Sequence, residues 1–212
     1  MPSTVHTMTV PVIVPVTVTV IAYNPRMARW EPDAQGRLEQ AALELYVERG
    51  FEQTTVAEIA ARAGLTERTF FRHFADKREV LFRGHELADA MSSAIAGLPA
   101  SVPALDAVSA AIQSPSDFFA DRREHARRRQ EVIAANPGLQ ERELIKLASL
   151  SSSIRAALHR RGVTEPAASL AAEAGIAVFK VAFERWLDDP DGRSLAEHVR
   201  ESLAELRAVT RP

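Results

Sequence analysis

Three signals for the start of a helix follow one another closely in this chain, and they limit its fold more than any other feature. Thr55-Val-Ala-Glu58 is a capping box, in which the Thr hydroxyl and the Glu carboxylate each satisfy a free backbone amide. Gly64 then supplies the permissive backbone of a sharp turn, and Thr66 can cap the next helix. Asp76-Lys-Arg-Glu79 repeats the capping pattern with Asp as the cap. Short helices joined by tight turns are therefore predicted here.

Apolar residues at helical spacing surround these signals. Ahead of them, one stripe of a helix that ends at Gly50 is formed by Leu38, Ala41, Ala42, Leu45 and Tyr46. The helix after Thr55 is about two turns long, with a buried face formed by Val56, Ile59, Ala60 and Ala63. The third helix turns Phe70 and Phe74 inward. The Asp76 signal is expected to start a fourth, longer helix that runs towards Gly97.

Two short helices joined by a glycine turn, behind a longer one, are what a helix-turn-helix unit needs. Such a rigid unit can place one helix in a DNA major groove about 12 Å wide, and the third helix is the candidate reader. Its outer faces carry Thr66, Glu67, Arg68, Thr69, Phe71, Arg72 and His73. The helix starts at Thr55 and at Asp76-Lys77 present free amides of the kind that hold phosphates, and Lys77 adds a charge. Any small helical protein has such caps, but three in succession favour the helix-turn-helix.

Composition excludes several classes of protein. The 212 residues are 46% hydrophobic and 25% charged, which excludes a disordered, collagenous or purely disulfide-stapled chain. The absence of Cys excludes disulfides, Fe–S clusters, thiolate zinc sites and a Cys nucleophile, and it fits a reducing compartment. The net charge of -2 gives no global basic field, so nucleic-acid binding must come from a local patch.

The N-terminal segment differs from the rest of the chain. Val5 to Ala22 alternates Val and Thr and is interrupted by Pro11 and Pro15. A secretory signal would need Lys or Arg ahead of its apolar run, and the first such residue is Arg26; the run is also too short to span a bilayer as a helix. We therefore expect residues 1–33 to be a disordered tail, with no membrane partner and a cytoplasmic location. An edge strand or aggregation-prone arm is the alternative.

A family resemblance is carried by the stretch from Thr54 to Leu81, TTVAEIAARAGLTERTFFRHFADKREVL. It resembles the DNA-binding signature of the TetR family of bacterial regulators, and the resemblance covers roughly residues 34 to 85. It implies an all-α homodimer with a helix-turn-helix DNA-binding domain at 34–83 and a helical ligand-binding and dimerisation domain at 84–212. The implied function is a repressor that binds a palindromic operator in double-stranded DNA and is released by a small hydrophobic or amphipathic effector.

The resemblance also assigns site residues. The residues that commonly face DNA in that family match Thr55, Thr66, Arg68, Thr69, His73 and Lys77, and the outer face adds Glu67 and Phe71. We expect Arg68 and Thr69 to contribute base readout, while Thr55, His73 and Lys77 mainly hold the backbone. Family members usually carry Tyr in place of Phe71, and the Tyr hydroxyl reaches a phosphate. Phe71 can offer only apolar contact to sugar or a thymine methyl.

The C-terminal part is predicted to be helical throughout. The expected helices are Ala104 to Gln113, Ser114 to Asn136, Leu139 to Arg161, Glu165 to Leu187 and Ser194 to Val209. Small residues on the helix from Glu165 allow close approach of another helix: Ala167, Ala168, Ala171, Ala172, Ala174, Gly175 and Ala177. The resemblance implies that the last two helices pack against their symmetry mates as a four-helix bundle. Packing within one chain is an equal alternative for each Ala.

Two sets of side chains in this part could bind an effector. Candidate pocket residues are Phe118, Phe119, Leu147, Leu150, Phe179 and Phe183, within a wider apolar set that includes Ile133, Leu144, Ile154 and Trp186. Plain core is the alternative for these side chains. A basic run could receive an anionic inducer such as a phosphate-bearing acyl thioester, and it comprises Arg122, Arg123, His125, Arg127, Arg128 and Arg129. Consecutive arginines spread around a helix, so a solvated face with salt bridges is favoured.

An enzyme is the competing class of protein. His73, His85, His125, His159 and His198 show no HExxH or His-x-His spacing, and there is no Gly-rich phosphate loop or nucleophile elbow. We therefore expect no catalytic residues, no metal and no cofactor. A helical protein-interaction module that uses DNA as an anchor, without a small-molecule inducer, remains the other alternative. Salt-dependent binding to a palindrome that is lost with a small molecule would separate the two.

Overall fold

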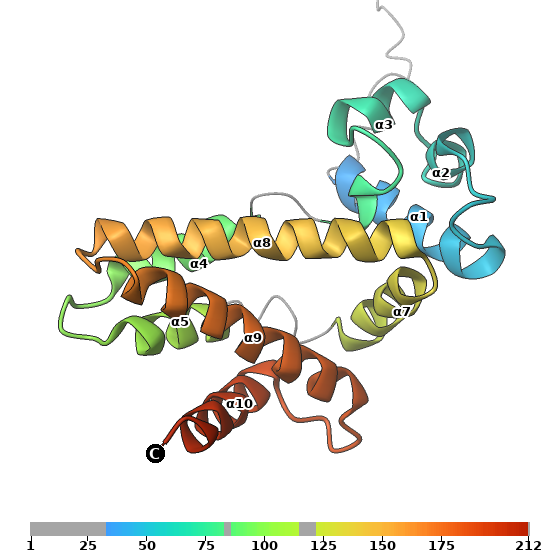
Figure 1. Ribbon diagram of the computed structural model, residues 1–212. Helices are drawn as coiled ribbons and strands as arrows, with labels where there is room; N and C mark the ends of the chain where they lie inside the picture. Colours follow the sequence, from blue (N-terminus) through green and yellow to red (C-terminus); the bar gives the residue numbers. More distant parts are fainter. Residues whose placement is uncertain (1–32, 83–85, 115–121, 212) are drawn as a thin grey trace, which may run out of the picture. The chain divides into compact units, whose positions relative to one another are not determined.

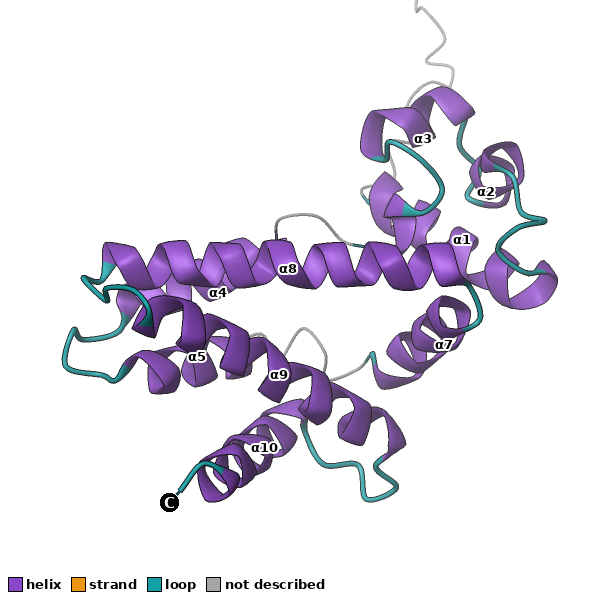
Figure 2. Ribbon diagram, in the orientation of Figure 1, coloured by secondary structure: helices purple, strands orange, loops and turns teal. Residues whose placement is uncertain are grey.

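The computed structural model describes residues 33–82, 86–114 and 122–211. These residues form nine α-helices and one 3-10 helix and contain no strand, so the all-α fold is confirmed (Figures 1 and 2). The expected tail lies outside the described residues apart from Asp33, and so do His85, Phe118 and Phe119. No helix among the described residues is long and apolar enough to cross a membrane.

The first three helices follow the predicted caps. They are α1 (Ala34–Arg49), α2 (Val56–Arg62) and α3 (Glu67–His73). The Thr55–Glu58 capping box is present at α2, and the Thr66 hydroxyl accepts from the Thr69 amide at α3. Between them Gly64 has a φ of 66°, a conformation that glycine adopts without strain. Local side-chain chemistry is enough to define this part of the fold.

A small core holds these three helices together. Its fully buried members include Leu38, Ala42, Ile59 and Phe70. The Phe70 ring lies 5.5 Å from that of Phe74 and 5.4 Å, edge on, from that of Phe71. The predicted inward direction of Phe70 and Phe74 is confirmed, since both are buried.

The predicted fourth helix from Asp76 to Gly97 is wrong at its start. Asp76 does cap, because its Oδ1 accepts from the amides of Arg78 (2.7 Å) and Glu79 (3.2 Å). Only a 3-10 turn follows, η1 (Glu79–Leu81), and α4 (Glu86–Gly97) begins later. Val80, Leu81 and Phe82 are all buried in the same core. The helical path stops at Phe82, whose φ of -118° and ψ of 83° lie outside the helical region, so its side chain can reach the same core as Val80 and Leu81.

The C-terminal helices are close to their predicted positions. They are α5 (Ala104–Gln113), α7 (Arg123–Ala134), α8 (Pro137–Arg160), α9 (Ala167–Asp188) and α10 (Leu195–Val209). The predicted single helix from Ser114 to Asn136 is interrupted, because Arg122 has a φ of -117° and a ψ of 12°, outside the helical region, and residues 115–121 are not described. α9 packs against α5, α8 and α10, and α8 packs against α4 and α7.

Small residues let α5 and α9 approach closely. Ala168, Ala172 and Gly175 are buried within the chain, whereas Ala177 is exposed. A Cβ atom added at Gly175 would lie 2.3 Å from Cγ1 of Val108 on α5. Packing within one chain therefore accounts for one side of the small-residue stripe, and the other side remains open.

Adding a methyl group at Gly175 should destabilise the protein. We expect Gly175→Ala to lower the free energy of unfolding by about 1–2 kcal/mol, since the β-branched Val108 has few rotamers in a helix with which to move away. Urea denaturation measures this difference. Gly138→Ala is the control, because nothing lies within 4 Å of its added Cβ. Equal effects of the two changes would contradict the clash, and Val108→Ala should restore stability in the Gly175→Ala background.

A buried carboxylate organises the turn between α9 and α10. Asp189 Oδ2 lies 3.0 Å from Nε2 of His198, and the carboxylate accepts from the amides of Asp191 and Arg193. Burial by itself raises the pKa of Asp189, but the hydrogen bonds from His198 and the two amides, with the charge of Arg193, outweigh it and lower the pKa to about 2.

This low pKa predicts how stability depends on pH. A carboxyl whose folded-state pKa is depressed stabilises the fold above its unfolded pKa of about 4. The stabilisation is lost as the pH falls through the folded value of about 2. The Tm deficit of Asp189→Asn should therefore be full near pH 6 and should shrink between pH 4 and pH 2. Asp188→Asn, at the exposed neighbour, is the control. A deficit that does not change with pH would contradict the role of the charge.

Candidate DNA interface and effector cavity

The predicted reading face of α3 is open to solvent. The exposed side chains are Thr66, Glu67, Arg68, Phe71, Arg72 and His73. Thr69 is half-buried, with its hydroxyl 3.0 Å from that of Thr66. Phe71 is 55% exposed although it is a large apolar side chain on a polar face. The structure thus brings these side chains together on one short helix, and their contact with DNA stays a prediction.

The arginines of this region differ in what they contact. Arg62 on α2 pairs with Glu48 (2.9 Å) and Glu44 (3.4 Å) of α1, and Arg49 pairs with Glu58 (3.0 Å). Arg68 has no hydrogen bond or ion pair within the part of the chain that the structure describes. Arg68 is therefore a cation that can engage a base or phosphate without first breaking a contact.

Lys77 has a different environment from the one expected. Its ammonium donates to the carbonyls of Phe51 (2.9 Å), Glu52 (3.2 Å) and Thr54 (3.0 Å), and it lies 4.5 Å from the centre of the Phe51 ring. An ammonium has three donors, so all three are engaged in holding the turn between α1 and α2. A phosphate contact by Lys77, as predicted, would have to replace one of these bonds.

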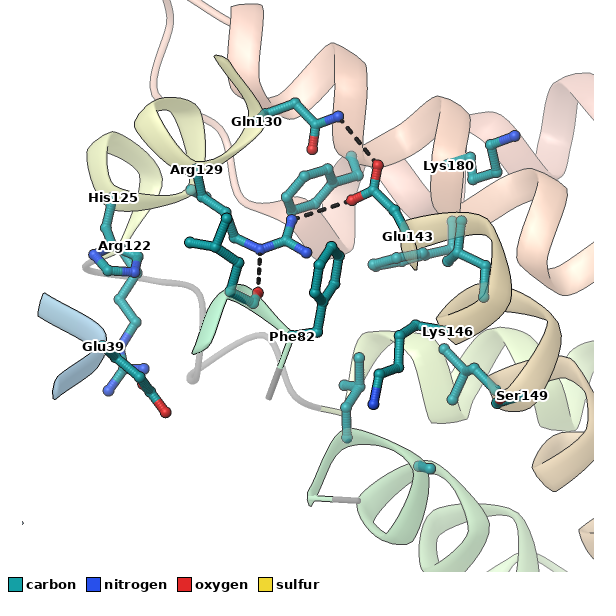
Figure 3. Close-up of a pocket in the computed structure, with 18 of the residues that line it drawn as sticks. Glu39, Phe82, Arg122, His125, Arg129, Gln130, Glu143, Lys146, Ser149 and Lys180 are labelled. Carbon is teal, nitrogen blue, oxygen red and sulfur yellow. Dashed lines mark hydrogen bonds and ion pairs between the residues drawn. The ribbon is translucent and has the colours of Figure 1, made fainter. Parts of the chain in front are cut away.

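A cavity of about 600 Å³ lies between α1, η1, α4, α7, α8 and α9 (Figure 3). Its larger apolar lining residues are Leu43, Val80, Leu81, Phe82, Leu87, Leu147, Leu150, Phe179 and Phe183. Its polar lining residues are Glu39, Arg122, His125, Arg129, Gln130, Glu143, Lys146, Ser149, Ser153, Lys180 and Glu184. The cavity therefore combines an apolar wall with a charged one.

Four of the predicted pocket residues line this cavity: Leu147, Leu150, Phe179 and Phe183. Of the wider apolar set, Ile133, Ile154 and Trp186 are core, and Leu144 is 61% exposed. Sequence reasoning missed the contribution of Leu43 and Val80–Phe82, which belong to the predicted DNA-binding half. The spacing of these residues in the sequence predicts that they are buried, but it does not predict that they contact α7 and α8.

The arginine-rich helix is not a simple solvated face. Arg128 forms an exposed pair along the helix, with Glu124 at 2.9 Å. Arg123 donates to the carbonyls of Asp189 (2.8 Å) and Arg193 (2.5 Å), and Arg127 donates to that of Leu187. The favoured interpretation is therefore wrong for the half-buried Arg123, whereas Arg127 is exposed as expected but contacts a carbonyl rather than an acid. Carbonyls at the end of a helix lack partners and attract cations, which explains why Arg127 reaches the end of α9.

Arg129 connects α7 to η1 and α8. Its Nε donates to the carbonyl of Leu81 (2.7 Å), its Nη1 lies 3.2 Å from Oε1 of Glu143, and its guanidinium lies 5.1 Å from the centre of the Phe82 ring (Figure 3). Burial lowers the pKa of Arg129, and the attraction of Glu143 only partly opposes this shift.

Glu79 connects η1 to α8. Its carboxylate lies 3.0 Å from Nζ of Lys146 and also pairs with Arg142. The Glu79 side chain is only 17% exposed, so these pairs are less screened by solvent than the surface pairs of α1 and α2. Among the described residues no group of three His, Cys, Asp or Glu side chains could hold a metal ion.

Comparison with known protein families places the chain. Residues 39–83 match the model of the bacterial regulatory proteins of the tetR family, and residues 102–211 match that of the MftR C-terminal domain. The chain belongs to the TetR family of bacterial regulatory proteins. It is therefore a DNA-binding transcriptional regulator. The prediction that it is not an enzyme agrees with its relatives, which are named as transcriptional regulators.

Two curated relatives are similar to this TetR-family chain. It is 27% identical over 173 residues to the putative mycofactocin biosynthesis transcriptional regulator MftR of Mycobacterium tuberculosis (strain ATCC 25618 / H37Rv), covering 79% of the chain and 86% of MftR. It is 40% identical over 79 residues to the transcriptional regulator TcmR of Streptomyces glaucescens. That match covers 37% of the chain, which spans only about a third of TcmR (35%).

A solved structure shares the fold. The transcriptional regulator FadR from Bacillus subtilis, in complex with stearoyl-CoA, superposes with a TM-score of 0.56 and 18% identity. The superposition covers 80% of this chain and 95% of that one. At this identity the likeness concerns the fold alone.

Proposed function

We propose that this TetR-family regulator is a repressor that binds a palindromic operator as a homodimer and is released when a small amphipathic effector enters the cavity. The observation that carries the proposal is the composition of the cavity wall. Leu43, Leu81 and Phe82 belong to the proposed DNA-binding domain (34–83), whereas Leu147 and Phe179 belong to the proposed effector domain (84–212). An effector bound there would touch the part of the chain that reads DNA.

An open apolar stripe on α9 supports the homodimer. Leu170, Ala174, Ala177 and Val181 recur at helical spacing, and Leu170 and Val181 are 67% and 49% exposed. A second copy related by a two-fold axis would cover this stripe with its own. Two reading helices presented by such a dimer would match half-sites about 34–36 Å apart.

Phe71 gives the proposed DNA contact a testable chemical feature. We expect that replacing one particular thymine of the operator by deoxyuridine weakens protein binding by about 0.8 kcal/mol. The replacement removes only the methyl group that contacts the Phe71 ring. Fluorescence anisotropy with singly substituted operators measures the loss. The loss should vanish in the Phe71→Ala protein. The same loss in both proteins would contradict the contact.

The operator and the response can be tested on the full chain. Bound fragments are selected from genomic DNA, and binding to the enriched sequence should be salt-dependent, two-fold symmetric and specific. Stearoyl-CoA, the ligand of the Bacillus subtilis FadR structure, is the first effector to titrate. By reciprocity the effector should bind the DNA-bound protein more weakly by the same factor, about 5- to 150-fold.

A cavity-filling variant is the control for the site. Leu147→Trp should occupy the cavity, keep operator affinity and lose the response to the effector. Release that persists in Leu147→Trp would place the effector elsewhere. Operator binding that no small molecule changes would favour the alternative, an interaction module anchored to DNA.

A further inference from the structure

The charged wall of the cavity is neutralised by carboxylates of the chain itself. Arg129 is paired with Glu143 (Figure 3). Lys146 is paired with Glu79. Gln130 also donates to Glu143, at 3.4 Å. Arg129, Glu143 and Lys146 all line the cavity, so a molecule that enters it meets both members of the first pair and the cation of the second.

The positive charge of Arg129 is only partly neutralised by its partners. A guanidinium has five N–H donors, and it binds a carboxylate best through two parallel bonds. Within the described residues Arg129 gives one bond to Glu143 and one to the carbonyl of Leu81. The lowered pKa of Arg129 agrees with a desolvated charge that one carboxylate does not fully balance. Donor capacity for a further anion is therefore present at the cavity wall.

The same two cations hold the segment that follows the reading helix. Arg129 binds the carbonyl of Leu81, and Lys146 binds Glu79, so both fix η1 to the effector domain. At its other end, the hydroxyl of Tyr46 on α1 donates to the carbonyl of Lys77 at 2.6 Å. Lys77 in turn holds the turn between α1 and α2. A change at Arg129 or Lys146 is thereby connected to the position of helices α1 to α3, which form the proposed reading unit.

We propose that this charged wall binds an anionic group of the effector, which takes the places of the Glu143 and Glu79 carboxylates at Arg129 and Lys146. The inference rests on the proposed function, in which the cavity binds the effector. The ligand class is an apolar chain, packed against residues such as Leu150 and Phe183, that ends in a carboxylate or phosphate. As Arg129 and Lys146 turn to this group, η1 loses the bond from Arg129 to the Leu81 carbonyl and the ion pair between Lys146 and Glu79, while Arg142 keeps its pair with Glu79. The loosened η1 releases the reading unit from its DNA-binding position.

Four ten-carbon probes separate the head group from the chain: decanoate, decyl phosphate, decan-1-ol and decylamine. Isothermal titration of the full chain should give about tenfold tighter binding of at least one anion than of the alcohol, the gain of one charge-assisted hydrogen bond. Decylamine should bind most weakly, although Glu39 and Glu184 also line the cavity. The two anions show whether a carboxylate or a phosphate is the natural group. Operator release should follow the anions.

Variants of the internal carboxylate give the sharper test. Glu143→Gln removes the competing charge and keeps the shape, so anion affinity should rise about five- to tenfold while alcohol affinity stays unchanged. A purely structural Glu143 would give weaker or equal binding of every probe. Arg129→Gln should weaken the preference for anions, because Lys146 is then the remaining cation of the proposed site. Glu124→Gln is the control, because Glu124 forms an exposed ion pair on α7, the helix that carries Arg129. Thermal melting confirms that each variant is folded.

The outcomes separate this inference from the proposed function. Equal binding of decanoate, decyl phosphate and decan-1-ol would overturn the anion site, while operator release by the alcohol would leave the proposed function intact. Binding of none of the four probes would also overturn the anion site, and the stearoyl-CoA titration would then decide the proposed function by itself. Tighter anion binding by Glu143→Gln, with coupled operator release, is the result that supports the inference.

Discussion

Replacing Phe70 by alanine is expected to lower the free energy of unfolding by about 3–5 kcal/mol, a large fraction of the roughly 5–15 kcal/mol that stabilises a native domain. Phe70 is 0% exposed and lies at the centre of the small core between α1, α2 and α3. Truncation removes its contacts with Phe74 and Phe71 and leaves a cavity that short, capped helices cannot easily close. Urea denaturation followed by circular dichroism measures the loss.

The neighbouring phenylalanine is a matched control. Phe71→Ala changes the same side chain one residue further along α3, but that side chain is 55% exposed. Its stability cost should stay below about 1 kcal/mol, which is the value of one aromatic edge contact. Phe71→Ala should therefore stay folded and lose only part of its operator affinity, whereas Phe70→Ala should lose most of its stability. Similar stability losses for the two variants would contradict the assigned orientation of α3.

Arg68→Ala is expected to cost about 1–3 kcal/mol of operator binding and to relax specificity at one base pair. Arg68 lies exposed on α3, and its guanidinium has no ion pair to give up among the described residues. Arg68→Lys should keep the charge and still lose discrimination, because lysine cannot form two parallel bonds to guanine. Anisotropy titrations with the operator and its single-base variants measure both effects.

Two controls accompany this prediction. Arg62→Ala removes an arginine that is engaged with Glu44 and Glu48, so it should change specificity little. Lys77→Ala should weaken all sequences similarly and lower the salt slope by about one if Lys77 reaches a phosphate. The three carbonyls that Lys77 holds mean that the same variant should also lose stability. Unchanged preference for the operator in Arg68→Ala would contradict base readout by Arg68.

The parts of the fold that were predicted from sequence are those that local chemistry determines. The Thr55 and Thr66 caps and the helical spacing of Leu38 and Leu45 need only near neighbours in the chain. The interruption after η1 could not be predicted in this way. It depends on burying Val80, Leu81 and Phe82 together in a core that includes Ile133 and Leu139, more than fifty residues away in sequence.

The same distinction applies to the cavity. Leu147, Leu150, Phe179 and Phe183 were predicted because large apolar side chains at helical spacing turn to one side. The ion pairs were not, since Glu79 meets Lys146 and Arg129 meets the carbonyl of Leu81 only after distant helices pack. An arginine run in a sequence does not show which of its members leave the solvent.

The close approach of α5 and α9 also restricts how this chain can diverge from its relatives. The space beside Gly175 is filled by a methyl group of Val108, so the volumes of these two side chains are shared. A substitution that enlarges one position is tolerated only after the other has become smaller. Across TetR-family proteins that keep this helix pair, alanine or serine in place of Gly175 should therefore occur together with a residue smaller than valine in place of Val108.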